Sequence, residues 1–549
     1  MKYLSIILVF CAFNLQAQLL TEATNFTQKD SLRGGLRFER TCFNVLHYDL
    51  DVQINPDDKY ISGSNTITFK ILEATQKIQL DLYKNLTIDS IVSKNQQLKF
   101  ERIHNAVFIE FEDEIKKGET QKVEVFYRGK PTEAKRAPWD GGFDFSKDHQ
   151  GNHFIGVAVQ GDGASLWYPN KDHLSDEPDN GANIKVSVPN GLMNVSNGRL
   201  IEKIPQENNY TKWHWEVTQP INNYNITVNI GKYVNFKDQY KDLDLDYYVL
   251  EDHLEIAKVH FEQVHEMMDC FYDKFGEYPF VEDSFKLVET PYLGMEHQSC
   301  VAYGNQYNFG YMGNDLSGTG KGLDWDFIII HESAHEWFGN SVSVADIADL
   351  WIHEGFTTYA EGVFIECKNG YNDAMDYLYG IRRNIENKRP LIGTYGVNHS
   401  GPGDIYYKGA NMINTLRSIV NDDELWWKTL KNFAESFKHQ ITNTNEVIDF
   451  FNRELEHDYS SFFDQYLNYK DIPVLQIKKK GRNKVQMKWK AHAKQFEMPI
   501  FVSFIDENKV YQINLDRNWT TTNLKMKDLQ KLRIDNYTSY FDIEYLDEE

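Results

Sequence analysis

The sequence predicts a multidomain α+β protein, and three changes of pattern along its 549 residues support this. Apolar and polar residues alternate repeatedly from Phe43 to about Lys241, which is typical of half-buried strands. Helical spacing replaces this alternation from Glu251, and alternation returns after Pro473. We therefore expect a short leader at 1–17, a β domain at 18–241, a mainly helical domain at 242–472 and a second β domain at 473–549.

The first 17 residues have the pattern of a cleaved signal peptide. A basic start at Lys2 precedes an apolar run from Leu4 to Phe13, and Ala17 ends a plausible cleavage site. The run is too short to span a membrane, and polar sequence follows it. A lipid anchor on Cys11 is disfavoured because the bulky Phe10 precedes that cysteine. We predict export to the periplasm or the extracellular space and no transmembrane segment.

Composition disfavours one class of partner. The formal net charge is −23, and acidic and basic residues are interspersed along the chain. A nucleic-acid-binding surface requires clustered Lys and Arg, so we expect no nucleic-acid partner. An aromatic content of 14% fits a globular protein with large cores.

Four cysteines remain beyond the leader, and they are scattered over more than three hundred residues: Cys42, Cys270, Cys300 and Cys367. Their spacing is not that of a disulfide framework. We expect buried free thiols, and a bridge between Cys270 and Cys300 stays open.

The N-terminal β domain is predicted from alternation in segments such as His47 to Ile54 and Asn65 to Ile71, which indicates antiparallel strands. Turn clusters such as the one beginning at Asn55 separate these strands.

The helical domain is predicted to open with a core helix from Glu251, which Gly276 ends. A strand from Ser284 to Thr290 follows and leads to Gly294. If that strand lies at the edge of a cleft, an extended peptide can pair with its backbone.

A metal-binding motif lies inside this domain. His331 and His335 are four residues apart, and Glu332 follows the first of them. On a helix from Ile328 to Asn340, capped by Asp324, both imidazoles share one face and can reach one metal ion. This His-Glu-x-x-His pattern is typical of zinc hydrolases. The alternative is a pair of histidines that only packs or faces solvent.

A third ligand is expected because catalytic zinc normally has three protein ligands and an open position. Glu354 follows His335 after eighteen residues, on a predicted second helix that ends near Cys367. An antiparallel helix pair would bring its carboxylate back to the metal. Glu361 falls on the same face, and we expect it to orient a ligating histidine.

The sequence resembles the zinc aminopeptidases of the aminopeptidase N family, which includes leukotriene-A hydrolase. HESAHEWFGN followed by DLWIHEGFTTYAE carries the resemblance. Gly294–His297 resembles the family's Gly-x-Met-Glu-Asn motif, and Tyr406–Gly409 resembles its Tyr-x-Lys-Gly motif. Phe462–Tyr466, followed by Pro473, is similar to the end of the family's catalytic domain. The resemblance runs from about residue 40 to about 475.

The resemblance also implies an architecture. It makes the N-terminal part an antiparallel β saddle and the middle part a thermolysin-like catalytic domain. The residues after Pro473 suit a small β-sandwich. We expect the large helical C-terminal domain of many family members to be missing here, which would leave the cleft more open.

The family match assigns a role to each motif residue. It implies one Zn²⁺ per chain on His331, His335 and Glu354, with Glu332 as general base. The segment Gly294, Met295 and Glu296 would bind substrate, and Glu296 would hold the free amino terminus. Tyr406 would stabilise the oxyanion, and the motif register selects it over the adjacent Tyr407. Gln160 would line the pocket.

Two positions depart from the family pattern. His297 replaces the usual asparagine after Glu296, and Ala164-Ser165 stand where the family has an arginine after the glutamine. We expect an exported zinc aminopeptidase acting on peptides with a free N-terminus. A zinc endopeptidase, a non-catalytic peptide-binding relative and an epoxide-opening side activity remain as alternatives. The preferred N-terminal residue and the oligomeric state are not predicted.

Overall fold

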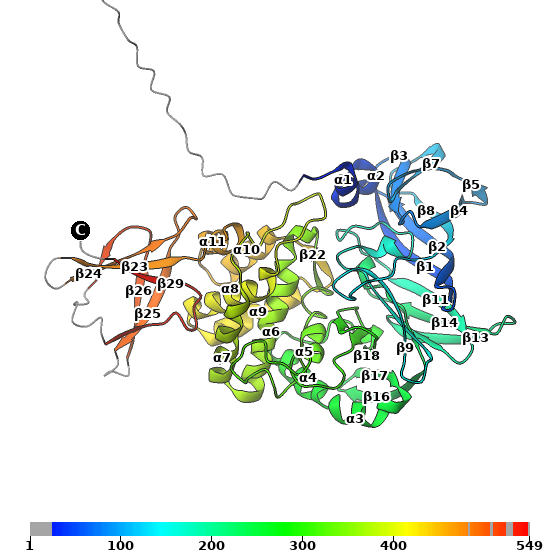
Figure 1. The fold of residues 1–549 in the computed structure, drawn as a ribbon. Helices are drawn as coiled ribbons and strands as arrows, with labels where there is room; N and C mark the ends of the chain where they lie inside the picture. Colours follow the sequence, from blue (N-terminus) through cyan, green and yellow to red (C-terminus); the bar gives the residue numbers. More distant parts are fainter. Residues whose placement is uncertain (1–24, 481–483, 505–508, 523–530, 547–549) are drawn as a thin grey trace, which may run out of the picture.

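The computed structural model describes residues 25–480, 484–504, 509–522 and 531–546. They form a β-rich part, a mainly helical part and a second β part, with the helical part in the middle of the molecule (Figure 1). The predicted fold class is therefore confirmed. The predicted signal peptide at 1–17 lies outside the described residues.

The N-terminal part is built on an eight-stranded sheet in the order β13-β14-β11-β1-β2-β8-β4-β5. Two smaller sheets, β3-β7-β6 and β12-β15-β10-β9, complete it. Neighbours in the large sheet are antiparallel except for the parallel pair β1 and β11, which a long excursion of chain connects. The elements are α1 (Gln28–Gly34), α2 (Phe38–Thr41), β1 (Phe43–Asn55), β2 (Tyr60–Ile71), β3 (Thr75–Asp81), β4 (Leu86–Ser93), β5 (Gln96–Gln97), β6 (Lys99–Ile103), β7 (Ala106–Ile115), β8 (Thr120–Gly129), β9 (Gly142–Lys147), β10 (His153–Ala158), η1 (Ala164–Leu166), β11 (Ala182–Pro189), β12 (Met193–Val195), β13 (Arg199–Pro205), β14 (Tyr210–Val217), η2 (Asn223–Asn225) and β15 (Asn229–Gly231).

A five-stranded sheet opens the helical part, in the order β16-β17-β18-β20-β19. The strand predicted to edge the cleft, β18, is internal, because it pairs with both β17 and β20. The edge strand is instead β19, a two-residue strand that pairs only with β20. The strands are β16 (Tyr233–Tyr240), β17 (Leu243–Leu250), β18 (Phe285–Glu289), β19 (Gly294–Met295) and β20 (Val301–Tyr303).

Helices make up most of the rest of this part. The helix predicted from Glu251 is divided near Phe261 into α3 and α4, and Gly276 follows α4 with φ +96°, a conformation that favours glycine. The elements are α3 (Leu254–His260), α4 (Gln263–Lys274), α5 (Phe327–Ala334), β21 (Val342–Val344), η5 (Ile347–Asp349), α6 (Trp351–Asn369), α7 (Tyr371–Ile381), α8 (Asp404–Val420), α9 (Asp423–Ser436), β22 (Gln440–Thr442), α10 (Thr444–Glu454) and α11 (Ser460–Asn468). None of the described helices is both long enough and apolar enough to cross a membrane.

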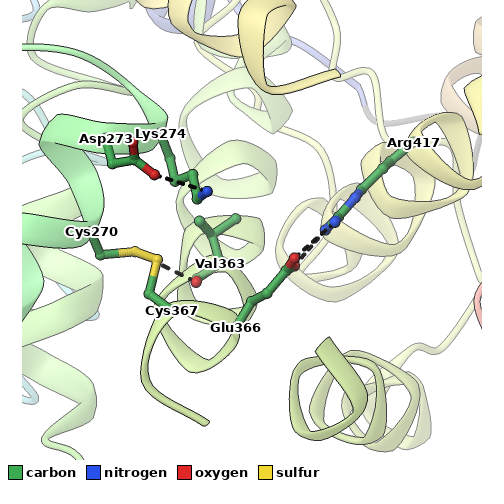
Figure 2. The surroundings of a disulfide bond; sticks show 7 residues. All are labelled: Cys270, Asp273, Lys274, Val363, Glu366, Cys367 and Arg417. Carbon is green, nitrogen blue, oxygen red and sulfur yellow. Dashed lines mark hydrogen bonds and ion pairs between the residues drawn. A yellow bond between two sulfur atoms is a disulfide. The ribbon is translucent and has the colours of Figure 1, made fainter. Parts of the chain in front are cut away.

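A disulfide joins α4 to α6 through Cys270 and Cys367 (Figure 2). The expectation that both are free thiols is wrong, and Cys300 is not the partner of Cys270. The two residues are 97 positions apart in sequence, yet helix packing brings their Cα atoms within 5.9 Å. Among the described cysteines, Cys42 and Cys300 are free and buried.

The C-terminal part is a sandwich of two sheets, β27-β24-β23-β29 and β26-β25-β28. Alternate residues of both sheets, including Leu475, Trp489 and Ile500, are buried between them. The strands are β23 (Val474–Lys480), β24 (Lys484–Lys490), β25 (Met498–Phe504), β26 (Val510–Leu515), β27 (Thr520–Thr521), β28 (Leu532–Ile534) and β29 (Asp542–Leu546).

Candidate active site

Helix α5 carries the His-Glu-x-x-His motif, and its start is fixed by Asp326. The Asp326 carboxylate accepts hydrogen bonds from the backbone N–H groups of Ile328 (2.9 Å) and Ile329 (3.3 Å). The predicted cap Asp324 is therefore wrong by two residues. The regular helix also ends earlier than predicted, at Ala334, but His335 keeps right-handed helical dihedrals (φ −60°, ψ −21°). Its ring therefore stays on the same face as that of the first histidine.

Three buried side chains converge between α5 and α6. Nε2 of His331 lies 3.8 Å and Nε2 of His335 lies 3.4 Å from Oε2 of Glu354. The three atoms lie within 4.8 Å of one another. Glu354 Oε2 has no hydrogen-bond partner among the described residues, although it is buried. Two imidazoles and one carboxylate are a donor set that zinc prefers, so these residues fit that metal.

The far nitrogen of each ring is held by a different kind of acceptor. Nδ1 of His331 donates to Oε1 of Glu361 (2.6 Å), whose other oxygen accepts from the Tyr377 hydroxyl (2.6 Å). Nδ1 of His335 donates instead to the backbone carbonyl of Phe338 (2.9 Å). Because Nδ1 is the donor in both rings, Nε2 is left with its lone pair towards the shared site. Glu361 thus lies where its predicted orienting role requires.

Glu332 lies on the pocket side of α5 beside the edge strand β19. A Cβ added to Gly294 would lie 2.8 Å from Oε1 of Glu332 and 2.8 Å from Cγ2 of Ile328. A larger residue at position 294 would therefore displace the Glu332 carboxylate. Burial, together with the nearby charge of Glu296, raises the pKa of Glu332 well above its usual range.

Glu296 follows β19 directly and is 3% exposed. Its Oε1 accepts hydrogen bonds from Nε2 of Gln160 (2.5 Å) and from the Tyr224 hydroxyl (3.1 Å). Both donors come from the N-terminal part, so the carboxylate is oriented across the junction of two parts. Burial raises the pKa of Glu296. Sequence reasoning missed Tyr224, because no local pattern connects it to a residue 72 positions away.

The two adjacent tyrosines of α8 both line the pocket, but they face different groups. The Tyr406 ring stacks on His331 with centroids 6.1 Å apart. Burial and the charges of Glu354 and Glu296 raise the pKa of Tyr406 well above its usual range, so its hydroxyl stays protonated. Burial, together with the charge of Glu361, raises the pKa of Tyr407 to about 12. The predicted preference for Tyr406 over Tyr407 fits this arrangement.

His297, which departs from the family pattern, does not line the pocket. It is fully buried, and neither ring nitrogen has a hydrogen-bond partner among the described residues. Burial lowers the pKa of His297 to about 3, so the ring is neutral at ordinary pH. It contributes no charge beside Glu296.

The His-His-Glu donor set, Glu332, Glu296 and Tyr406 all line one pocket of about 500 Å³. The N-terminal part contributes Trp139 and Gln160, and β19 with the residue after it contributes Met295 and Glu296. The helical segments contribute His331, Glu332, His335, Glu354, Glu361 and Tyr406. A separate hollow of about 450 Å³ lies between α11 and the C-terminal sandwich and contains none of these groups. The first pocket can therefore hold a metal ion, an acid–base group, an amine-binding carboxylate and a phenol donor together.

Sequence profiles of two known domains match the chain. The Peptidase M1 N-terminal domain matches residues 44–224, and the Peptidase family M1 domain matches residues 259–466.

Several curated relatives are similar over part of their length. Aminopeptidase N of Lactobacillus helveticus is 23% identical over 478 residues, which cover 80% of this chain and 52% of that protein. Probable aminopeptidase 1 of Sulfurisphaera tokodaii is 20% identical over 520 residues, covering 90% of this chain and 61% of that protein. The chain thus spans about half to three-fifths of the length of these relatives.

A solved M1 zinc metallopeptidase from Deinococcus radiodurans has a similar fold. Its TM-score is 0.65 at 20% identity, and the match covers 79% of this chain and 95% of that one.

Proposed function

Because the chain belongs to the M1 family of peptidases, we propose that it is a zinc-dependent aminopeptidase. It hydrolyses the first peptide bond of peptides that have a free N-terminus.

The observation that carries this proposal is the position of Glu296. Carboxylate oxygens of Glu296 and Glu332 and a ring nitrogen of His335 all lie within 4.8 Å of one another. A buried carboxylate binds an ammonium group by charge-assisted hydrogen bonds. An ammonium held there brings the first peptide bond next to the His-His-Glu donor set. A chain that continued past Glu296 would leave that buried carboxylate without a cationic partner, which disfavours internal cleavage.

The donor set His331, His335 and Glu354 would hold one zinc ion. When bound, zinc supplies Lewis-acid chemistry: it polarises a carbonyl group and lowers the pKa of water. Glu332 takes the proton from the attacking water and delivers it to the leaving amine. The Tyr406 hydroxyl donates to the oxygen on which negative charge develops.

Gln160 and Tyr224 have a positioning role in this scheme. Both donate to Oε1 of Glu296, which leaves Oε2 for the substrate ammonium. Similar solved structures of M1 zinc metallopeptidases are described as bound to a Tyr-Ser-Ala substrate, to L-tryptophan and to L-arginine. Each of those ligands carries an amino group that such a carboxylate can bind.

We further propose that the protein acts outside the cytoplasm. The predicted signal peptide supports this, and so does the Cys270–Cys367 disulfide, since disulfides persist in oxidising compartments. Cell fractionation with N-terminal sequencing should find a chain that begins at Gln18, and its Cys270 and Cys367 should resist alkylation until the protein is reduced. An uncleaved cytosolic chain with free thiols would contradict export.

The deciding experiment uses the purified chain with its zinc content measured. One leucine-initiated peptide is supplied with a free and with an acetylated N-terminus, and products are identified by mass spectrometry. Release of leucine from the free peptide alone is the expected result. Internal cleavage of both forms would establish an endopeptidase. If the zinc-loaded protein cleaved neither this peptide nor others with different first residues, the enzymatic proposal would fail.

A further inference from the structure

The rim of the pocket presents an exposed tryptophan. The Trp139 side chain is 63% exposed, while the other ten tryptophans, all within the described residues, are buried or half-buried. Trp139 also lines the pocket that contains the donor set. Covering a large apolar side chain at the edge of a binding pocket with a ligand removes apolar surface from water, which favours binding.

The loop that carries Trp139 is held in place. Both oxygens of Asp140 accept hydrogen bonds from the backbone N–H groups of Lys135 (2.7 Å) and Arg136 (2.6 Å), which closes the loop. The backbone N–H of Gly141 donates to Asp162 (2.7 Å). The tryptophan loop is therefore joined to the loop of Gln160, and the indole is presented in a defined position.

The loop of Gln160 is in turn fixed by three elements. Its Gly161 carbonyl accepts hydrogen bonds from Arg33 of α1 (3.1 Å) and from Asn398, which lies before α8 (3.3 Å). Its Asp162 carbonyl accepts from the Tyr83 hydroxyl (3.0 Å). Gln160 itself contacts Glu296. The two loops thus connect Trp139 to the carboxylate that is proposed to bind the substrate's amino group.

The remaining walls of the pocket carry no free charge. The ionisable acids and bases of the lining, apart from tyrosines, are His331, His335 and the four glutamates 296, 332, 354 and 361, and each has a role or a buried partner described above. The other lining side chains are neutral and largely apolar. They include Leu293, Met295, Leu316, Phe327, Leu350 and Ile405. A charged substrate side chain would lose its hydration here without gaining a partner.

We propose that Trp139 is a specificity-determining residue that packs against the side chain of the substrate's first residue. The enzyme accordingly prefers peptides that begin with a large apolar or aromatic residue. This inference rests on the proposed aminopeptidase function. It assigns the substrate class to an apolar rim that is separate from the catalytic groups.

The test compares five peptides that differ only in the first residue: phenylalanine, leucine, alanine, arginine and glutamate. We expect kcat/KM for phenylalanine and leucine to exceed the other three by about 10- to 100-fold, the usual range for hydrophobic discrimination. Trp139→Ala should reduce the phenylalanine-to-alanine ratio by about tenfold, mainly through KM, because uniform binding is lost. Trp139→Phe should keep most of that ratio.

The matched control is Tyr545→Ala, which removes an aromatic side chain of similar exposure (64%) from β29, a strand that contributes nothing to the pocket lining. This variant should leave the phenylalanine-to-alanine ratio of kcat/KM unchanged. Equal cleavage of all five peptides, or a preference for arginine or glutamate, would overturn the proposed specificity while the aminopeptidase function stands. A Trp139→Ala protein that loses activity equally on all peptides would show a structural role instead. If none of the free peptides is cut, the proposed function itself fails.

Discussion

The two ends of the pocket are built on opposite principles. At the end that carries the proposed zinc site, six ionisable side chains are each at most 9% exposed. They come from α5 and the residue after it, from α6, and from the residue after β19. At the mouth, Trp139 is 63% exposed and stands on loops of the N-terminal part. Charges that do chemistry must be desolvated and oriented, whereas a surface that selects a side chain must be free to receive it.

Under the proposed function, this difference separates the residues that carry out the reaction from the residue that selects the substrate. Substitutions at the buried end should change turnover or metal binding for every peptide alike. Substitutions at the mouth should change the ranking of peptides. The following predictions test that separation, beginning with the largest expected effect.

At the buried end of the pocket, the substitution Glu332→Gln should abolish most of the enzyme's turnover. The amide keeps the shape of the side chain but cannot accept the water's proton, so kcat should fall by about 10²- to 10⁴-fold on every peptide. Zinc content, measured by atomic absorption, should stay at one ion per chain. Near-normal kcat in this variant would exclude Glu332 as the general base.

Glu361→Gln should weaken metal binding more than it changes the fold. An amide cannot hold Nδ1 of His331 as firmly as a carboxylate does, so zinc affinity should fall by about 10- to 100-fold. Competition with a chelator of known affinity measures this. Tyr377→Phe, which removes only the hydroxyl that donates to Glu361, should give a smaller change. If Glu361→Gln left zinc affinity unchanged, its orienting role would be wrong.

Tyr224→Phe should give the smallest effect on the reaction, because it leaves the Glu296 carboxylate in place with one hydrogen-bond donor. It removes one of two hydrogen bonds to Oε1 of Glu296. A single hydrogen bond contributes about 0.5–1.5 kcal/mol, so KM for peptides with a free N-terminus should rise by about 2- to 10-fold.

Tyr168→Phe is the matched control for that change. Its buried hydroxyl donates to the backbone carbonyl of Asn223 in the same turn, not to Glu296. A similar rise in KM in both variants would indicate general loosening of the turn and would remove Tyr224 from the amine site.

Local spacing in the sequence was sufficient to predict the order of the parts, the His-Glu-x-x-His residues and Glu354, whereas the roles of Glu296, Tyr406 and Gln160 came from the family resemblance. His331 and His335 share a helical face because the helix repeat is a property of neighbouring residues. The strand alternation around Leu50 and Ile67, and the family resemblance, led to the same fold class. Errors within these elements were small: the cap of α5 is Asp326, and the strand 285–289 is internal.

What remained was decided by packing between segments that are far apart in sequence. Cys270 meets Cys367 only because α4 lies against α6. Tyr224 reaches Glu296, and Trp139 reaches the pocket, because the N-terminal part packs on the elements that carry the candidate site. Hydrogen bonds and covalent bonds act over a few ångströms, and the periodicity of a chain does not report which distant residues come that close. The sequence therefore determined which residues form the candidate site. The tertiary structure determined which residues orient them and which residue lies at the opening of the pocket.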